Sequence, residues 1–200
     1  MSKRYPIVAL LLLALTAHAE LIDRIAVSVG NRVITQSDLE RQIRVIAFQN
    51  GTAPDFTAAN KRAVAEKMIQ QKLIQRELES SRYPVPLPAE IMPAVEEFVK
   101  THFPDEAAYQ RALGEYKITA QDLMDVLLWE RRLLRFIEMR FETGIQVTTQ
   151  EVDAFALQKS LPAADAERAL ISDRADQQVD QWLRDVRRRT DVIVHEEVFQ

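Results

Sequence analysis

Few side chains in this sequence have the type and spacing that enzyme chemistry requires. Neither His102 nor His195 has a second histidine at the helical spacing of a zinc site, so no metal site is expected. The chain contains no cysteine, which excludes thiolate nucleophiles, thiolate metal ligands and disulfides. No serine lies in a Gly-x-Ser-x-Gly elbow or three residues before a lysine, so the common serine nucleophile motifs are missing as well.

The paired carboxylates and the glycines indicate no site either. Glu96 is adjacent to Glu97, and Glu196 to Glu197. Because adjacent residues on a helix point apart, we interpret both pairs as solvated. The sequence has only four glycines, and no two of them are close enough to build a phosphate-binding loop or a dinucleotide fingerprint. We therefore expect neither an enzyme nor a cofactor.

Arginines gather at residues 131–140 and 184–189, which raises the question of nucleic-acid binding. The net charge of the chain is −4, and Glu130, Glu138 and Asp185 can pair with these arginines at helical spacing. The charge balance favours solvated helix faces, and we expect no nucleic-acid partner.

The first nineteen residues have the three parts of a secretory signal. Lys3 and Arg4 precede an apolar run over residues 7–15, and the small residues Ala17 and Ala19 mark a cleavage site. The apolar run is too short for a membrane span, which needs about 20 residues. We expect a signal peptide at 1–19, cleavage after Ala19, a periplasmic location and no stable membrane insertion.

Alternating apolar residues predict a β-hairpin at the start of the mature chain. Ile25, Val27 and Val29 lead into a turn at Gly30, and a second short run follows at 33–34. Residues 192–194 form another β-branched run near the other end of the chain. Because an isolated hairpin is only marginally stable, we expect this terminal strand to join it as a third strand.

Helices account for the rest, so the predicted fold class is mainly α, a multi-helix module with a small β-hairpin. Three helix starts, at Thr35, Thr119 and Thr148, share a threonine cap, an acid three residues later and flanking apolar residues, which is the pattern of a capping box with a hydrophobic staple. Apolar spacing predicts the other helices and the extent of these, at 57–82, around 91–99, from Pro104 through Leu113, at 119–142, at 148–159 and at 173–189.

Two segments are open to interpretation. The helix at 119–142 has apolar residues on more than one face, so it either lies centrally in the core or presents an apolar surface. Of these alternatives we favour the central position, because helices that are apolar all round are usually buried. The stretch at 161–172 contains Pro162 and is weakly periodic, so we interpret it as a short connection.

The segment from Ile22 to Leu39 resembles the opening of the mature chain in the SurA family of periplasmic chaperones. Residues 68–74 are similar to the long second helix of that family, 145–152 to the exit from its chaperone domain, and 179–194 to its C-terminal helix and strand. The resemblance implies a chaperone domain at 20–160 and a C-terminal helix and strand at 173–200 that pack back on it. Family members usually have parvulin prolyl-isomerase domains between these two parts, whereas in this chain only the short connection at 161–172 lies between them.

The resemblance therefore implies an ATP-independent periplasmic chaperone that has kept the client-binding part and lacks the isomerase. Its clients would be unfolded or extended polypeptides, above all outer-membrane proteins. We expect a groove between helices, lined by apolar and adaptable side chains. The candidate lining residues are Met92, Phe98, Trp129, Phe136 and Met139, and core packing is an equal alternative for each of them.

Two other functions stay open at this point. The chain could be an envelope adaptor or structural protein that binds one specific partner, or, as the third hypothesis, a peptidyl-prolyl isomerase. The short connection before the last helix also allows a homodimer in which two chains exchange their C-terminal elements.

Overall fold

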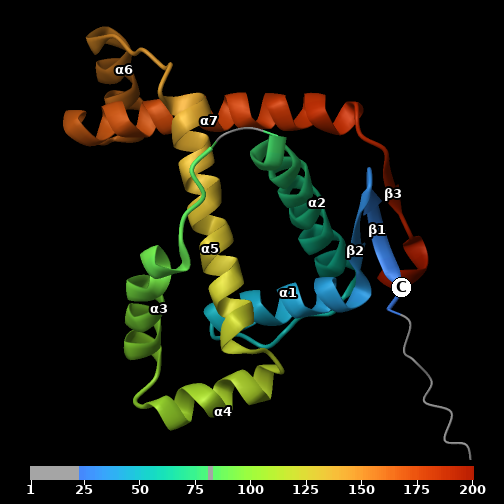
Figure 1. Cartoon of the computed structure of the whole chain (residues 1–200). Coiled ribbons are helices and arrows are strands. Elements are labelled where there is room, and N and C mark those ends of the chain that lie inside the picture. Colours follow the sequence, from blue (N-terminus) through green and yellow to red (C-terminus); the bar gives the residue numbers. More distant parts are fainter. Residues whose placement is uncertain (1–22, 81–82) are drawn as a thin grey trace, which may run out of the picture.

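The computed structural model describes residues 23–80 and 83–200 and is mainly helical, with one small sheet (Figure 1). The expected signal peptide at 1–19 lies outside the described residues. The elements are β1 Ile25–Val29, β2 Arg32–Thr35, α1 Gln36–Gln49, α2 Ala58–Ser80, α3 Pro88–His102, α4 Glu106–Tyr116, α5 Ala120–Ile137, the π-helix η1 Glu138–Glu142, α6 Thr149–Lys159, α7 Ala163–Arg188, β3 Val192–Val194 and the 3-10 helix η2 Glu196–Phe199. The predicted fold class is confirmed.

The sheet joins the two ends of the described chain. Its strand order is β2-β1-β3, and both pairings are antiparallel. Gly30 has a φ of +58° in the turn between β1 and β2, a conformation that strains any residue with a side chain. On the other edge of β1, Val27 lies opposite Val194, and the backbone N–H of His195 donates to the carbonyl of Ala26 at 2.9 Å. The expectation that the terminal strand joins the hairpin is confirmed.

Capping boxes begin the three helices for which the sequence predicts them. In each case the threonine hydroxyl accepts a hydrogen bond from the backbone N–H three residues later, and the acid at that position accepts one from the threonine N–H. The pairs are Thr35 with Asp38 in α1, Thr119 with Asp122 in α5 and Thr148 with Glu151 in α6. These bonds satisfy backbone donors that a helix start leaves unpaired, and so they fix where each helix begins.

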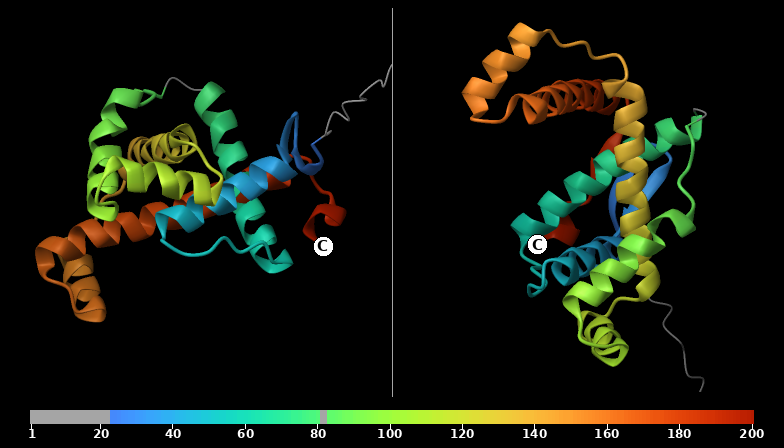
Figure 2. Two further views of the ribbon diagram at one scale, coloured as in Figure 1. Left: turned by 90° about the horizontal axis from the view of Figure 1, so that it is seen from below. Right: turned by 90° about the vertical axis from the view of Figure 1, so that its left-hand side faces the viewer.

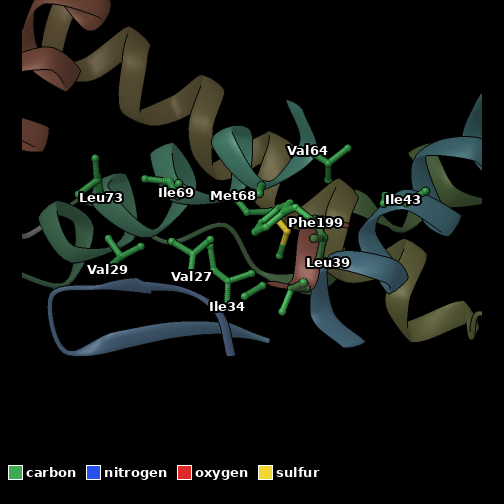
Figure 3. Packing of buried hydrophobic residues seen from close by; sticks show 13 residues of the cluster. Val27, Val29, Ile34, Leu39, Ile43, Val64, Met68, Ile69, Leu73 and Phe199 are labelled. Atoms are coloured by element: carbon green, nitrogen blue, oxygen red, sulfur yellow. The ribbon is translucent and has the colours of Figure 1, made fainter. Parts of the chain in front are cut away.

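The first hydrophobic core lies between the sheet and helices α1 and α2 (Figure 3). Val27 and Ile34 from the hairpin meet Leu39 of α1 and Ile69 of α2. Phe199 of η2 enters the same core and is only 1% exposed. The last residues of the chain thus complete the packing that its first strands begin.

A second core surrounds the end of α1 and is mostly aromatic. The ring of Phe48 packs against Phe98 and Phe103 at centroid distances of 5.8 and 5.5 Å, and against Tyr109 and Tyr116 at 6.3 and 5.4 Å. This cluster holds α3 and α4 against α1, and Leu123 of α5 is buried in it. The lower end of α5 is therefore fixed beside α1.

Helix α5 is not central in the core, which corrects the position favoured from its sequence. Only Leu123 and Phe136 of this helix are buried, and Leu134 is 61% exposed. In Figure 1 the helix forms one side of a frame whose other sides are α1, α2 and α7. The other apolar residues of α5 that belong to the hydrophobic clusters are only partly buried, so the helix keeps an apolar surface, which is the other alternative that its sequence allows.

The connection expected at 161–172 is wrong, because α7 already begins at Ala163. Pro162 stands directly before the helix, a position at which proline is tolerated because no intrahelical N–H is needed there. Ala166 and Leu170 are then buried against Val152 of α6. Figure 2 shows the result, a two-helix arm made of α6 and the first half of α7 that extends from the rest of the molecule.

We expect Phe199→Ala to destabilise the protein strongly, because it removes a buried ring from the core under the sheet. Burial of this kind is worth about 3–5 kcal/mol in the free energy of unfolding. Urea unfolding followed by circular dichroism measures this loss. The control is Leu157→Ala in the arm, where the side chain is 84% exposed and a change within about 0.5 kcal/mol is expected. Similar midpoints for the two variants would contradict the role of η2 in the core.

Candidate functional site

A groove with a volume of about 480 Å³ lies between α1, α2 and α5. Half of its lining is apolar, formed by Ile46, Val64, Met68, Ile74, Val126, Trp129 and Leu133. The other half is polar and consists mainly of side-chain amides, namely Gln42, Gln49, Asn50, Gln70 and Gln71 together with Lys67 and Glu130. The groove thus offers an apolar floor and a rim that can both donate and accept hydrogen bonds.

Each of the three helices contributes one stripe to this groove. On α1 the residues are Gln42, Ile46 and Gln49, at spacings of four and three. The same spacing recurs on α2 with Lys67, Gln71 and Ile74, and on α5 with Val126, Glu130 and Leu133. Residues so spaced lie on one face of a helix, so the periodicity of the sequence itself brings them together.

Trp129 also lines a second, smaller cavity. This cavity has a volume of about 320 Å³ and lies between the end of α2, the segment after it and α5. Its apolar lining includes Leu78, Tyr83, Val85 and Phe136. Trp129 thus contributes to the lining of both cavities.

Two carboxyls, one beside the groove and one in the arm, have shifted pKa values with opposite sign. Partial burial beside the groove raises the pKa of Glu130 above its ordinary value of 4.5, and a hydrogen bond with the Gln49 side chain counteracts part of this rise. In the arm, hydrogen bonds from the backbone N–H of Thr148 and from Arg174 lower the pKa of Glu151 to about 2. The charge of Glu130 is thus disfavoured by its surroundings, and that of Glu151 is stabilised.

The structure brings together only two of the five side chains that the sequence suggests for client binding. Trp129 lines the groove, and Phe136 contacts the second cavity but is a core residue, 1% exposed. Phe98 packs in the aromatic cluster around α1 and stacks on His102 at 4.3 Å between ring centroids. Met92 on α3 and Met139 on η1 are exposed, and neither lines these two cavities.

The amide residues of the rim are the part of the site that the sequence interpretation missed. They are polar and lie on faces of α1 and α2 that would ordinarily be solvated. The available signal is local: Gln42 and Gln49 lie four and three residues from Ile46, and Gln70 and Gln71 lie four and three residues from Ile74.

The described residues contain no group of three or more histidines and carboxylates that could hold a metal ion. His102 has its ring nitrogen Nδ1 at 2.8 Å from the carbonyl of Phe98, and His195 lies 3.8 Å from a carboxylate oxygen of Glu197. Both histidines thus have local partners in the fold. Over residues 23–80 and 83–200, no helix is long and apolar enough to cross a membrane.

Comparison with known proteins adds no family to this description. No family model matches the sequence, and no curated protein matches it either. The resemblance to SurA-type chaperones therefore stays a prediction, and the groove has to be interpreted from its own chemistry.

We expect the carboxyls of Glu130 and Glu151 to titrate on opposite sides of 4.5. A pH series of carbon-detected NMR spectra should place the midpoint of Glu130 above that value and the midpoint of Glu151 near 2.

Two consequences for stability follow from linkage. The contacts of Glu151 stabilise the arm above pH 4.5, and this contribution is lost as the pH falls toward 2. Glu130 has the reverse effect, because stability falls as the pH rises from 4.5 through its raised pKa.

Coinciding midpoints for the two carboxyls would contradict the difference in their surroundings. Glu130→Gln serves as the assignment control, since it removes one titrating signal and leaves that of Glu151 in place.

Proposed function

We propose that this protein is an exported, ATP-independent chaperone that holds unfolded or extended client segments in the groove between α1, α2 and α5. The observation that carries the proposal is the combination of an apolar floor with a rim of side-chain amides. An unfolded segment exposes apolar side chains together with backbone N–H and C=O groups that lack partners. The floor can bury the former, while glutamine and asparagine can donate to and accept from the latter.

The composition of the groove suits clients of varied sequence. Met68 contributes a flexible thioether side chain, which adapts to ligands of different shape. Lys67 and Glu130 are the charged side chains of the lining, one of each sign, so the groove has no strong preference for charged clients. The amides bind the backbone, which is common to all polypeptides. Together these features support binding that depends on exposure of the client chain more than on its sequence.

The groove is also built from elements that the rest of the fold holds in place. Its three walls are helices, and both α2 and α5 are packed against other elements near each end. Binding then requires little ordering of the chaperone, and a groove open to solvent releases its client without nucleotide hydrolysis. Outer-membrane proteins in transit through the periplasm are the clients that we propose, on the family resemblance.

We expect an excess of the protein over an unfolded β-barrel outer-membrane protein to suppress aggregation of the latter on dilution from urea. Gln70→Trp should raise the protein concentration required for this suppression by at least about threefold, because a large ring at the exposed rim occupies part of the groove. Trp129→Ala should also weaken the suppression, because it removes part of the apolar floor of the groove. Light scattering during dilution measures both effects.

The matched control is Gln110→Trp, the same exchange at an exposed position of α4 away from the groove. It should suppress aggregation as well as the unaltered chain. If Gln110→Trp and Gln70→Trp behave alike, the groove is not the client site. If the unaltered chain in excess leaves aggregation unchanged, and a pull-down instead retains a single stoichiometric partner, the protein is an envelope adaptor.

We also expect no acceleration of prolyl cis–trans isomerisation in a short peptide. We assign the groove, whose lining is apolar, amide and two charged side chains, a binding role only, and the uncatalysed process takes about 10–100 s at 25 °C. A protease-coupled assay detects any faster phase. A clear rate enhancement that scales with protein concentration would overturn the assignment of a purely binding role.

A further inference from the structure

A third cavity, of about 470 Å³, lies between the C-terminal ends of α2 and α7 and has a different chemistry from the groove. Three guanidinium groups line it, those of Arg76, Arg140 and Arg189, against the single carboxylate of Glu77. The hydroxyls of Ser80 and Thr190 are also in its lining. The cavity therefore has an excess of two positive charges over negative ones.

Arg140 is the fixed member of this cluster. Its Nη1 donates to Glu77 Oε1 at 2.6 Å and to the Tyr83 hydroxyl at 3.2 Å. Its guanidinium also lies over the rings of Phe136, Phe141 and Trp182, at 5.9, 5.6 and 5.2 Å from their centroids. These contacts hold the side chain in place, and Glu77 balances its charge.

Arg76 and Arg189 are not balanced in this way. Arg76 donates to the Thr190 hydroxyl at a long 3.5 Å, and Arg189 donates from Nε to the backbone carbonyl of Asp185 at 3.1 Å. In the described part of the chain, neither guanidinium has a carboxylate within ion-pair distance. By contrast, the two arginines just before Arg189 are paired: Arg187 forms an ion pair with Glu66, and Arg188 forms one with Asp185.

Each of these two arginines thus keeps most of its five N–H donors for a ligand. The carbonyl ends of α2 and α7 add partial negative charge nearby, and the bond from Arg189 to Asp185 offsets part of it. Two unbalanced guanidinium groups remain, and both belong to exposed residues at the mouth of the cavity. Such groups recognise oxyanions through paired hydrogen bonds, and phosphate in particular because it offers more oxygens and more charge than a carboxylate.

We propose that this cavity binds a phosphate group. Arg76 and Arg189 hold the phosphate oxygens. The Thr190 hydroxyl donates to the Val186 carbonyl at 2.9 Å and accepts from Arg76, so it positions that guanidinium at the cavity. The apolar wall of Leu73, Trp182 and Val186 accommodates an uncharged part of the ligand next to the phosphate. Inorganic phosphate and the headgroup of a phospholipid share this chemistry. The site is separate from the groove and does not depend on the proposed chaperone function.

The test measures binding of inorganic phosphate to the purified protein by isothermal titration calorimetry at constant ionic strength. A second arm measures flotation with vesicles of phosphatidylcholine, with and without phosphatidic acid. We expect saturable binding in at least one arm. Binding in both arms, or to inorganic phosphate alone, supports a phosphate site in general, whereas binding only to phosphatidic acid vesicles assigns the lipid headgroup.

The double variant R76Q/R189Q should weaken this binding by at least about tenfold, since it removes charge-assisted hydrogen bonds from two side chains. The matched control R184Q/R188Q removes two positive charges from α7 outside the cavity and should change affinity less than about twofold. Thermal unfolding of both variants checks that the fold is retained. No saturable binding in either arm, or equal weakening by the two double variants, would overturn the proposal.

Discussion

The pairing of β3 with β1 is the interaction on which the rest of the structure depends. β1 is the middle strand, and its two partners come from opposite ends of the described chain. A hairpin of β1 and β2 alone would be marginal. With β3 in place, η2 follows directly and delivers Phe199 to the core, and α7 is held across the end of α2 and against η1. One short strand therefore determines where a 26-residue helix lies.

The position of α7 explains why α5 can stand apart from α2 with a groove between them. The lower end of α5 is fixed in the aromatic cluster around Phe48, and its upper end runs into η1, where Phe136 and Phe141 pack on Trp182 of α7. Arg140 adds a polar contact from η1 to α2 through Glu77. Trp129 and Leu133 of α5 share a hydrophobic cluster with Ile74 and Leu78 of α2 and also line the groove or the neighbouring cavity. The groove is thus lined by α1, α2 and α5, whereas the arginine-lined cavity is lined by α2, η1 and the end of α7.

Local patterns made much of this fold predictable. The threonine-led capping boxes mark the starts of α1, α5 and α6, and alternation with a glycine turn marks the hairpin, because these signals depend on a few neighbouring residues. The start of α7 was not predictable in this way, because Pro162 is compatible with a loop or with a helix start and only packing on α6 decides between them. The burial of α5 and the amide rim depend on how distant helices are placed, which the periodicity of a single helix does not contain. For that reason Trp129 could be suggested from its apolar character, whereas the helical spacing of Gln42 and Gln70 does not by itself show that they line a groove.

The strand that completes the sheet also imposes an order on folding. Val27 and Val194 are separated by almost the whole chain, so their pairing carries the largest loop-closure cost among the contacts of the sheet. The helices, the hairpin and the α6–α7 arm rest on local contacts and can form earlier. Until the last residues arrive, the outer edge of β1 is unpaired and the pocket for Phe199 is empty. While its last residues are still being synthesised, this protein is itself a chain with an open strand edge and exposed apolar surface.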